Sequence, residues 1–144
     1  MHVNTKCCFD LQVVRTDILS DTGVSLNPEI DIGQIEGAFM FGLGLWLQEE
    51  IKHDPATGRI LTYDTWQYKP PASMDIPEEL RVSLYEWDKD SGKGVMGSKA
   101  TGEPGVHMGV SCVLALRRAI DAARTTILKA DPKDYYKLCK DLIS

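Results

Sequence analysis

The sequence lacks both a long apolar run and an excess of positive charge. Among its 144 residues, no window approaches the ~20 consecutive apolar residues of a membrane-spanning helix, and no apolar signal-peptide region follows the N-terminal residues. Sixteen Lys and Arg stand against 21 Asp and Glu, a formal net charge of -5, so no net positive field attracts nucleic acid. We therefore expect a soluble, cytoplasmic protein with neither a membrane nor a nucleic-acid partner.

Cysteine and histidine are scarce and scattered. The four cysteines have none of the close spacings that bind zinc or an iron–sulfur cluster; they are Cys7, Cys8, Cys112 and Cys139. The three histidines form no pair on a helix face; they are His2, His53 and His107. A disulfide between adjacent cysteines is strained, so free thiols are expected at Cys7 and Cys8. We predict that the protein supplies no metal ligand.

Three segments have the composition of strands. Residues 11–19 and 60–63 are rich in β-branched and apolar residues, and residues 80–87 alternate cleanly between apolar and polar. The proline-rich residues 68–77 fit neither regular element and predict an ordered crossing loop. A polar loop is expected over 88–94; it begins like a calcium site but has Lys99 where the bidentate glutamate is required.

Two long helices are predicted. The first begins at Asn27, a capping residue followed by Pro28, or at Asp31, which forms a capping-box pattern with Gln34. The second begins at Val106, and a short terminal helix follows from Asp131. We expect an α+β fold, a mixed sheet packed by two long helices, as a single domain over residues 11–144, with residues 1–10 disordered or unmatched.

Residues 30–50 are apolar on nearly every face, which predicts a buried helix. Its four glycines each cost roughly 1 kcal/mol relative to alanine, so they are expected to let something approach the helix backbone closely; they are Gly33, Gly37, Gly42 and Gly44. That neighbour is either another backbone or a bound ligand. The Gly42-Leu43-Gly44 run lacks the third glycine of a dinucleotide fingerprint.

One carboxylate stands in a setting suited to chemistry. Glu103 lies between Gly102 and Pro104 at the entrance to the second helix. Free amide groups there favour the ionised carboxylate, which could serve as a general base. The plainer alternative is a carboxylate that only satisfies those amides.

Four ordered blocks resemble the molybdopterin-binding region of the xanthine dehydrogenase and aldehyde oxidase family. They are residues 15–39, 68–77, 98–104 and 119–124. The third contains Ser-Lys-Ala-Thr-Gly-Glu-Pro, similar to the active-site loop of that family. The resemblance implies the molybdopterin-binding domain of a molybdenum hydroxylase, which oxidises aldehydes or N-heterocycles by hydroxylation at a molybdenum–molybdopterin centre.

The resemblance also implies roles for two residues. Glu103 matches the glutamate that acts as the general base of the family, and Gln34 matches the glutamine whose amide faces the cofactor. After Pro104 the family usually has proline or alanine and then bulky apolar residues, whereas this chain has Gly105, Val106 and His107. The shape of the substrate pocket is therefore not set by the resemblance.

Family members are much longer than this chain. We expect a C-terminal fragment of the molybdopterin-binding domain, inactive alone and completed by the rest of the polypeptide or by a homologous subunit. FAD and 2Fe–2S clusters are expected to be absent from this chain, because it has neither a dinucleotide fingerprint nor cluster-binding cysteine spacings. The alternative is a non-enzymatic, stand-alone domain that keeps the fold and binds a partner or small ligand.

Overall fold

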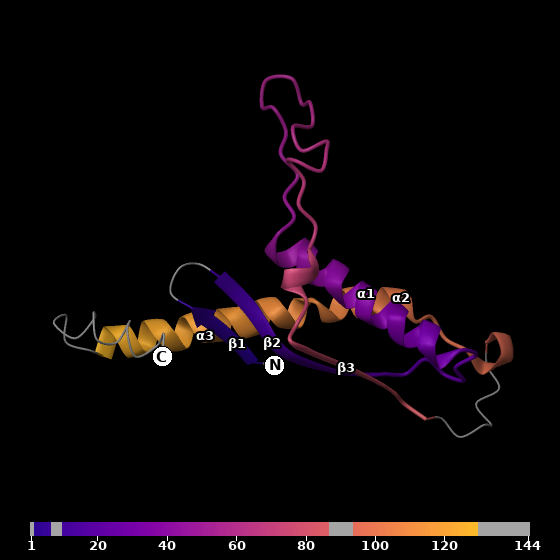
Figure 1. Cartoon of the computed structure of the whole chain (residues 1–144). Coiled ribbons are helices and arrows are strands. Elements are labelled where there is room, and N and C mark those ends of the chain that lie inside the picture. The colour runs from indigo at the N-terminus through magenta and orange to yellow at the C-terminus, as the bar shows by residue number, and fades with distance from the viewer. Residues whose placement is uncertain (1, 7–9, 87–93, 130–144) are drawn as a thin grey trace.

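A small mixed sheet forms one layer of the molecule. The computed structural model describes residues 2–6, 10–86 and 94–129. Its strands are β1 (His2–Lys6), β2 (Asp10–Ser20) and β3 (Glu79–Leu84), arranged in that order. β1 pairs with β2 in antiparallel fashion and β3 pairs with β2 in parallel (Figure 1). The mixed sheet of the predicted α+β fold is confirmed.

Two of the three predicted strands are confirmed, as β2 and β3. The strand predicted at residues 60–63 is wrong: Ile60 forms only an isolated bridge with His53. The segment lies in an excursion that leaves the sheet, so it has no neighbouring strand with which to form a ladder. β1 lies in a region where the sequence analysis assigns no strand.

The first helix begins where the sequence places it, whereas the second begins four residues before its predicted start at Val106, because the glycine-flanked residues before Val106 already form a helical turn. α1 spans Pro28–Leu47 with Asn27 as its N-cap, so the start at Asn27 is confirmed and the alternative start at Asp31 is wrong. The second predicted helix is divided at Gly109 into α2 (Gly102–Met108) and α3 (Val110–Lys129). The predicted terminal helix from Asp131, and all of the 88–94 loop except Gly94, lie outside the described residues.

The core lies between α1, the sheet and α3. Six buried residues form its centre, and apolar residues of β3 pack against them; the six are Val13, Ile18, Ile35, Phe39, Leu43 and Cys112. Burial also raises the pKa of the Cys112 thiol to about 11, because a thiolate is poorly solvated there. The face of α1 that contains Ile35, Phe39 and Leu43 therefore packs in the core.

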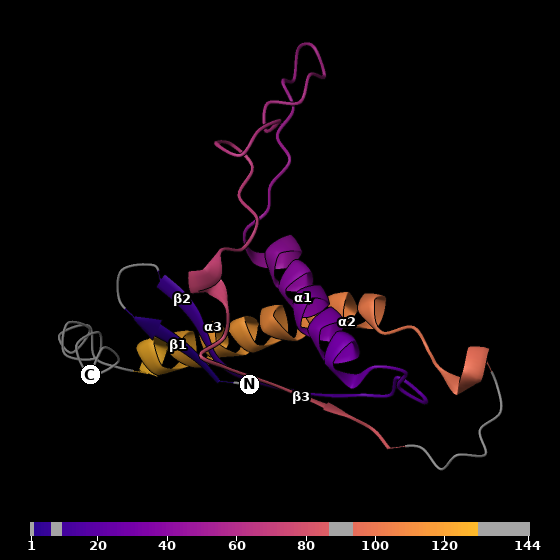
Figure 2. The same cartoon turned by 45° about the vertical axis from the view of Figure 1, so that its right-hand side comes forward.

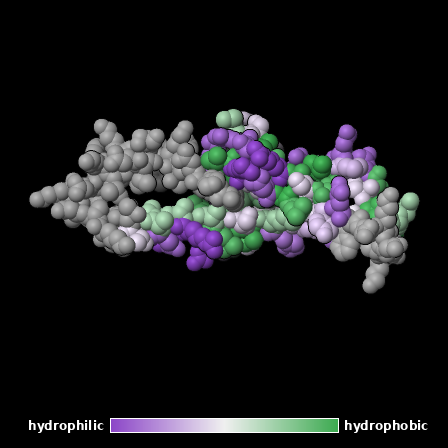
Figure 3. All heavy atoms as spheres, turned by 90° about the horizontal axis from the view of Figure 1, so that it is seen from below, coloured by the Kyte–Doolittle hydropathy of each residue, from purple (hydrophilic) through white to green (hydrophobic). Residues whose placement is uncertain are grey.

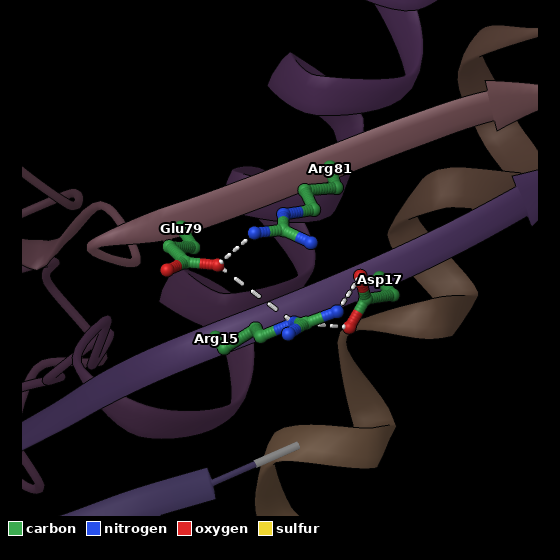
Figure 4. A network of polar contacts seen from close by, with 4 residues as sticks. All are labelled: Arg15, Asp17, Glu79 and Arg81. Atoms are coloured by element: carbon green, nitrogen blue, oxygen red, sulfur yellow. Dashed lines mark hydrogen bonds and ion pairs between the residues drawn. The ribbon is translucent and has the colours of Figure 1, made fainter.

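The other face of the sheet is charged. Arg15 Nε lies 2.7 Å from Asp17 Oδ2, and Arg81 Nη2 lies 2.7 Å from Glu79 Oε2 (Figure 4). The hydrogen bond from Arg15 holds the pKa of Asp17 below its ordinary value. Exposed pairs of this kind contribute little stability, but they mark this face as polar. The apolar face is the one toward α1, as strand alternation requires.

A long excursion connects α1 to β3. Residues 48–72 leave the end of α1, extend away from the sheet and helices, and return beside α1 (Figures 1 and 2). Tyr68 donates a hydrogen bond to Glu49 near the base, where the two limbs meet. The excursion presents large side chains to solvent, among them Trp66, which is 83% exposed, and Tyr63, which is 70% exposed.

α1 is not buried on every side as the sequence predicts. Its exposed apolar residues are Ile30, Phe41, Leu45 and Trp46, since the sheet and α2 cover only part of its circumference among the described residues. Hydrophobic residues therefore lie beside hydrophilic ones at the surface (Figure 3). None of the helices in the described ranges is long and apolar enough to cross a membrane, and the predicted cytoplasmic location stays a prediction.

The two phenylalanines of α1 offer a direct test of this packing. Phe39 is 0% exposed and Phe41 is 68% exposed. Phe39→Ala should reduce the free energy of unfolding by about 3–5 kcal/mol, the usual cost of deleting a buried ring. Phe41→Ala should change it by less than about 0.5 kcal/mol, as is typical of surface positions. Denaturant titration measures both, and equal losses would contradict the orientation of α1.

Candidate functional site

A cavity of about 270 Å³ lies between α1 and the beginning of α2. Gln34 and Glu103, which the resemblance singles out, both line it. The other lining residues are small or apolar: Gly33, Gly37, Ala38, Phe41, Gly102 and Val106. The fold therefore brings the two candidate residues, far apart in sequence, to one place.

A short backbone pairing brings the two helix starts together. The chain leaving β2 pairs with the loop before α2: Val24 N donates to Gly97 O at 2.9 Å, and Lys99 N donates to Thr22 O at 2.9 Å. Gly23 and Ser98 form a bridge between these hydrogen bonds. Because β2 leads into α1 and this loop leads into α2, the pairing places the N-terminal turns of both helices side by side.

Gln34 lies in the second turn of α1. Asn27 accepts a hydrogen bond from Ile30 N at 3.4 Å, and Asp31 lies in the first turn. Both features favour a helix that begins here, because one free amide of the first turn is satisfied and the helix dipole is complemented. The Gln34 side chain is exposed and reaches the first residue of α2, since a Cβ built on Gly102 would lie 3.4 Å from Gln34 Oε1.

Glu103 lies in the first turn of α2 and is also exposed. Within the described residues its side chain makes no hydrogen bond and no ion pair. The plainer role, a carboxylate that satisfies free helix amides, is therefore not what the geometry provides. The carboxylate is available to a group that enters the cavity.

The four glycines of α1 divide into two kinds. A Cβ on Gly42 would lie 2.2 Å from Val106 O, so this glycine lets the backbone of α2 approach. A Cβ on Gly44 would lie 2.4 Å from the Pro71 ring. At Gly33 and Gly37 a Cβ would meet no atom of the described chain within 4 Å. The predicted close approach is confirmed at Gly42 and Gly44, while the other two border the cavity.

Of the three residues after Pro104, where the sequence departs from the family pattern, only one lines the cavity. Val106 lines it, Gly105 is buried against α1, and His107 is exposed and does not line it. Phe41 also lines the cavity, although the sequence pattern predicts only that it lies in a buried helix. Its position seven residues after Gln34 is the signal that could have found it, because that spacing returns to the same helix face.

No cluster of metal-ligating side chains is found in the described part of the chain. No three His, Cys, Asp or Glu side chains there lie close enough together to hold a metal ion. A second cavity, of about 290 Å³, lies within the excursion and is lined by residues 62–65 with Tyr68 and Pro70. The cavity between the helices is the one that holds both candidate residues.

Comparison with known sequences identifies the family. Residues 4–77 match the family described as the molybdopterin cofactor-binding domain. The chain belongs to this family. It is 47% identical over 115 residues to the xanthine dehydrogenase/oxidase of Gallus gallus, and 45% identical over 115 residues to the aldehyde oxidase of Homo sapiens. Each match covers 80% of this chain and 8% of the relative.

These matches confirm the resemblance to the xanthine dehydrogenase and aldehyde oxidase family. The family match begins at residue 4, so it includes most of residues 1–10, which are expected from the sequence to be disordered or unmatched. The chain spans about 8% of the length of these curated relatives. It thus corresponds to one segment of these relatives, and molybdopterin is the cofactor that the family indicates.

Solved structures agree on the fold. The Cu,Mo-CO dehydrogenase matches with a TM-score of 0.59 at 23% identity, over 74% of this chain and 13% of that chain. Quinoline 2-oxidoreductase from Pseudomonas putida 86 matches with a TM-score of 0.56 at 24% identity, over 76% and 13%. The molybdopterin-domain segment is thus α+β, as predicted.

The cavity fits one edge of a molybdopterin group. The Gln34 amide can both donate and accept hydrogen bonds, and the open space over Gly33 and Gly37 lets a planar group approach the helix backbone. No Lys or Arg is among the lining residues, so the phosphate of such a group would need donors from elsewhere.

A matched pair of substitutions tests the division of the glycines. Leucine is a better helix former than glycine by roughly 0.8 kcal/mol, so Gly37→Leu should keep or raise the melting temperature. Gly42→Leu should lower it sharply, because its Cβ would overlap Val106 O. Thermal denaturation of the two variants measures the difference. A similar loss in both would show that Gly37 is packed rather than open.

Proposed function

We propose that this segment forms one wall of the active site of a molybdenum hydroxylase of the xanthine dehydrogenase and aldehyde oxidase type. Its substrates would be small aldehydes or N-heterocycles, which such an enzyme oxidises by hydroxylation. The observation that carries the proposal is that Gln34 and Glu103 line one cavity. Both are exposed in it, and no hydrogen bond or ion pair within the described residues occupies the Glu103 carboxylate.

Gln34 would orient the cofactor. When bound, the molybdenum centre accepts the two electrons that leave the substrate. The Gln34 amide adds no charge beside it, and it can donate through its NH₂ group or accept through Oε1. Gly33 and Gly37 support this role, because neither has a side chain that would keep the cofactor from the turns of α1 beside Gln34.

Glu103 would act as the general base. Its carboxylate can accept the proton of the hydroxyl group that attacks the substrate carbon, which makes that oxygen a better nucleophile. Glu103 lies between Gly102 and Pro104 in the first turn of α2. Its side chain can therefore face the cavity and does not pack in the core. A carboxylate at this place must hold and release a proton at Oε in each turnover.

The apolar lining would receive the substrate. Ala38, Phe41 and Val106 lie between the two polar side chains. An aromatic ring or a short carbon chain gains free energy by leaving water for such a surface. A bound substrate would also exclude water from the cavity, and the lower local dielectric constant would strengthen the electrostatic interactions of Glu103.

The remainder of the hydroxylase, as the same polypeptide or a homologous subunit, would complete the site. Two exposed apolar surfaces support this partner: the uncovered stripe of α1 that includes Phe41 and Leu45, and the excursion that carries Tyr63 and Trp66. Contiguous exposed apolar surfaces often mark interfaces. The absence of cationic residues from the cavity lining also requires donors from another part of the enzyme.

The general-base role predicts the effect of Glu103→Gln in a full-length enzyme that contains this segment. An amide cannot accept the proton, so kcat should fall by about 10²- to 10⁴-fold, with an unchanged melting temperature and molybdenum content. Glu29→Gln is the matched control, since Glu29 is an exposed acid in the first turn of α1 and does not line the cavity. Near-native turnover of the Glu103 variant would remove this residue from the mechanism.

The incomplete site predicts the behaviour of the chain alone. The 144-residue chain should fold but bind no stoichiometric molybdenum, because one amide and two glycines cannot hold a large anionic cofactor. Circular dichroism, elemental analysis and an assay with an aldehyde and an artificial electron acceptor test this. Stoichiometric molybdenum with turnover would show instead that the short chain is a complete enzyme.

A further inference from the structure

The helices α1 and α2 lie side by side (Figures 1 and 2) and meet at glycines. Gly102 and Gly105 of α2, and Gly109 directly after it, face Gln34, Ala38 and Gly42 of α1 in turn. The order is the same along both helices, so their backbones run in parallel. Each of these glycines removes a side chain from the contact.

Gly105, the glycine that follows Glu103 in α2, has no free space for a side chain. A Cβ at this position would lie 2.8 Å from Ala38 Cβ, 2.9 Å from Ile35 O and 3.3 Å from Phe39 N. Two of these atoms belong to the backbone of a buried helix face and cannot rotate aside. Any residue other than glycine must therefore push α2 away from α1.

The contact lies next to both site residues. Glu103 is two residues before Gly105 in the same seven-residue helix, and Gln34 directly precedes Ile35 in α1. A displacement of α2 at Gly105 is therefore transmitted to the separation between the Glu103 carboxylate and the Gln34 amide.

We propose that Gly105 is a positioning residue, which sets the distance between Glu103 and Gln34 by allowing α2 to touch the backbone of α1. This inference rests on the proposed function of Glu103. It lets α2 lie closer to α1 than a side chain at this place would allow. Glu103 would accept the proton, and Gly105 would determine where the Glu103 carboxylate lies.

The packing is tested first without the cofactor. Gly105→Ala should lower the melting temperature of the chain by several degrees, although alanine is the better helix former. Gly37→Ala is the matched control, because a Cβ there meets no atom within 4 Å, and it should not lower the melting temperature.

Adding Ala38→Gly to Gly105→Ala should recover part of the loss in melting temperature, since it removes the nearest clashing atom. A crystal structure of Gly105→Ala should show a longer Cα distance between residues 34 and 103. An unchanged melting temperature and distance would overturn the proposal.

The positioning role is tested in the full-length enzyme below the melting temperature of each variant. Gly105→Ala should lower kcat by about 10- to 100-fold, because a misplacement of about 1 Å can cost on the order of 10²-fold. In a Glu103→Gln background it should have little further effect, since the displaced base is already absent. An equal loss in both backgrounds, or normal turnover of Gly105→Ala, would overturn the positioning role. Normal turnover of Glu103→Gln would instead overturn the proposed function, so the two failures are distinguishable.

Discussion

The candidate site depends on the close approach of α2 to the backbone of α1. Two helices with ordinary side chains at their contact are separated by about 8–10 Å, and glycines allow a shorter distance. At Gly42 and Gly105 the neighbouring atoms leave no room for a Cβ. The hydrogen bonds between residues 22–24 and 97–99 align the beginnings of the two helices, and the glycines then bring them together. The cavity between Gln34 and Glu103 is the space left where this contact ends.

The distribution of apolar surface fits a segment of a larger protein. α1 is apolar on nearly all faces, yet the sheet and α2 cover only one part of it within the described residues. The uncovered part contains Leu45 and Phe41, and Phe41 also lines the cavity. A surface of this kind is costly in water and favours association with further polypeptide. The relatives, of which the chain covers 8%, are proteins that contain such polypeptide.

Local rules were enough for several elements. The cap at Asn27 with Pro28 determines where α1 begins, and the alternation from Leu80 onward determines β3, because both depend on residues that are neighbours in sequence. The strand predicted at 60–63 failed because a strand also needs a partner strand, and this segment leaves the sheet. The break at Gly109 was missed for a similar reason: the helical periodicity continues through it, and the close contact with Gly42 is visible only in three dimensions.

The sequence by itself determined the chemical types at the site: a carboxylate between glycine and proline, an amide early in a helix, and glycines that cost helix stability and therefore needed a reason. It also determined the family, through blocks that keep their order. Only the tertiary structure decided which glycine serves which purpose, because Gly37 and Gly42 are equivalent in sequence but face open space and a backbone respectively. It also decided that Glu103 and Gln34 share one cavity, since that proximity arises from hydrogen bonds and helix packing between segments that are distant along the chain.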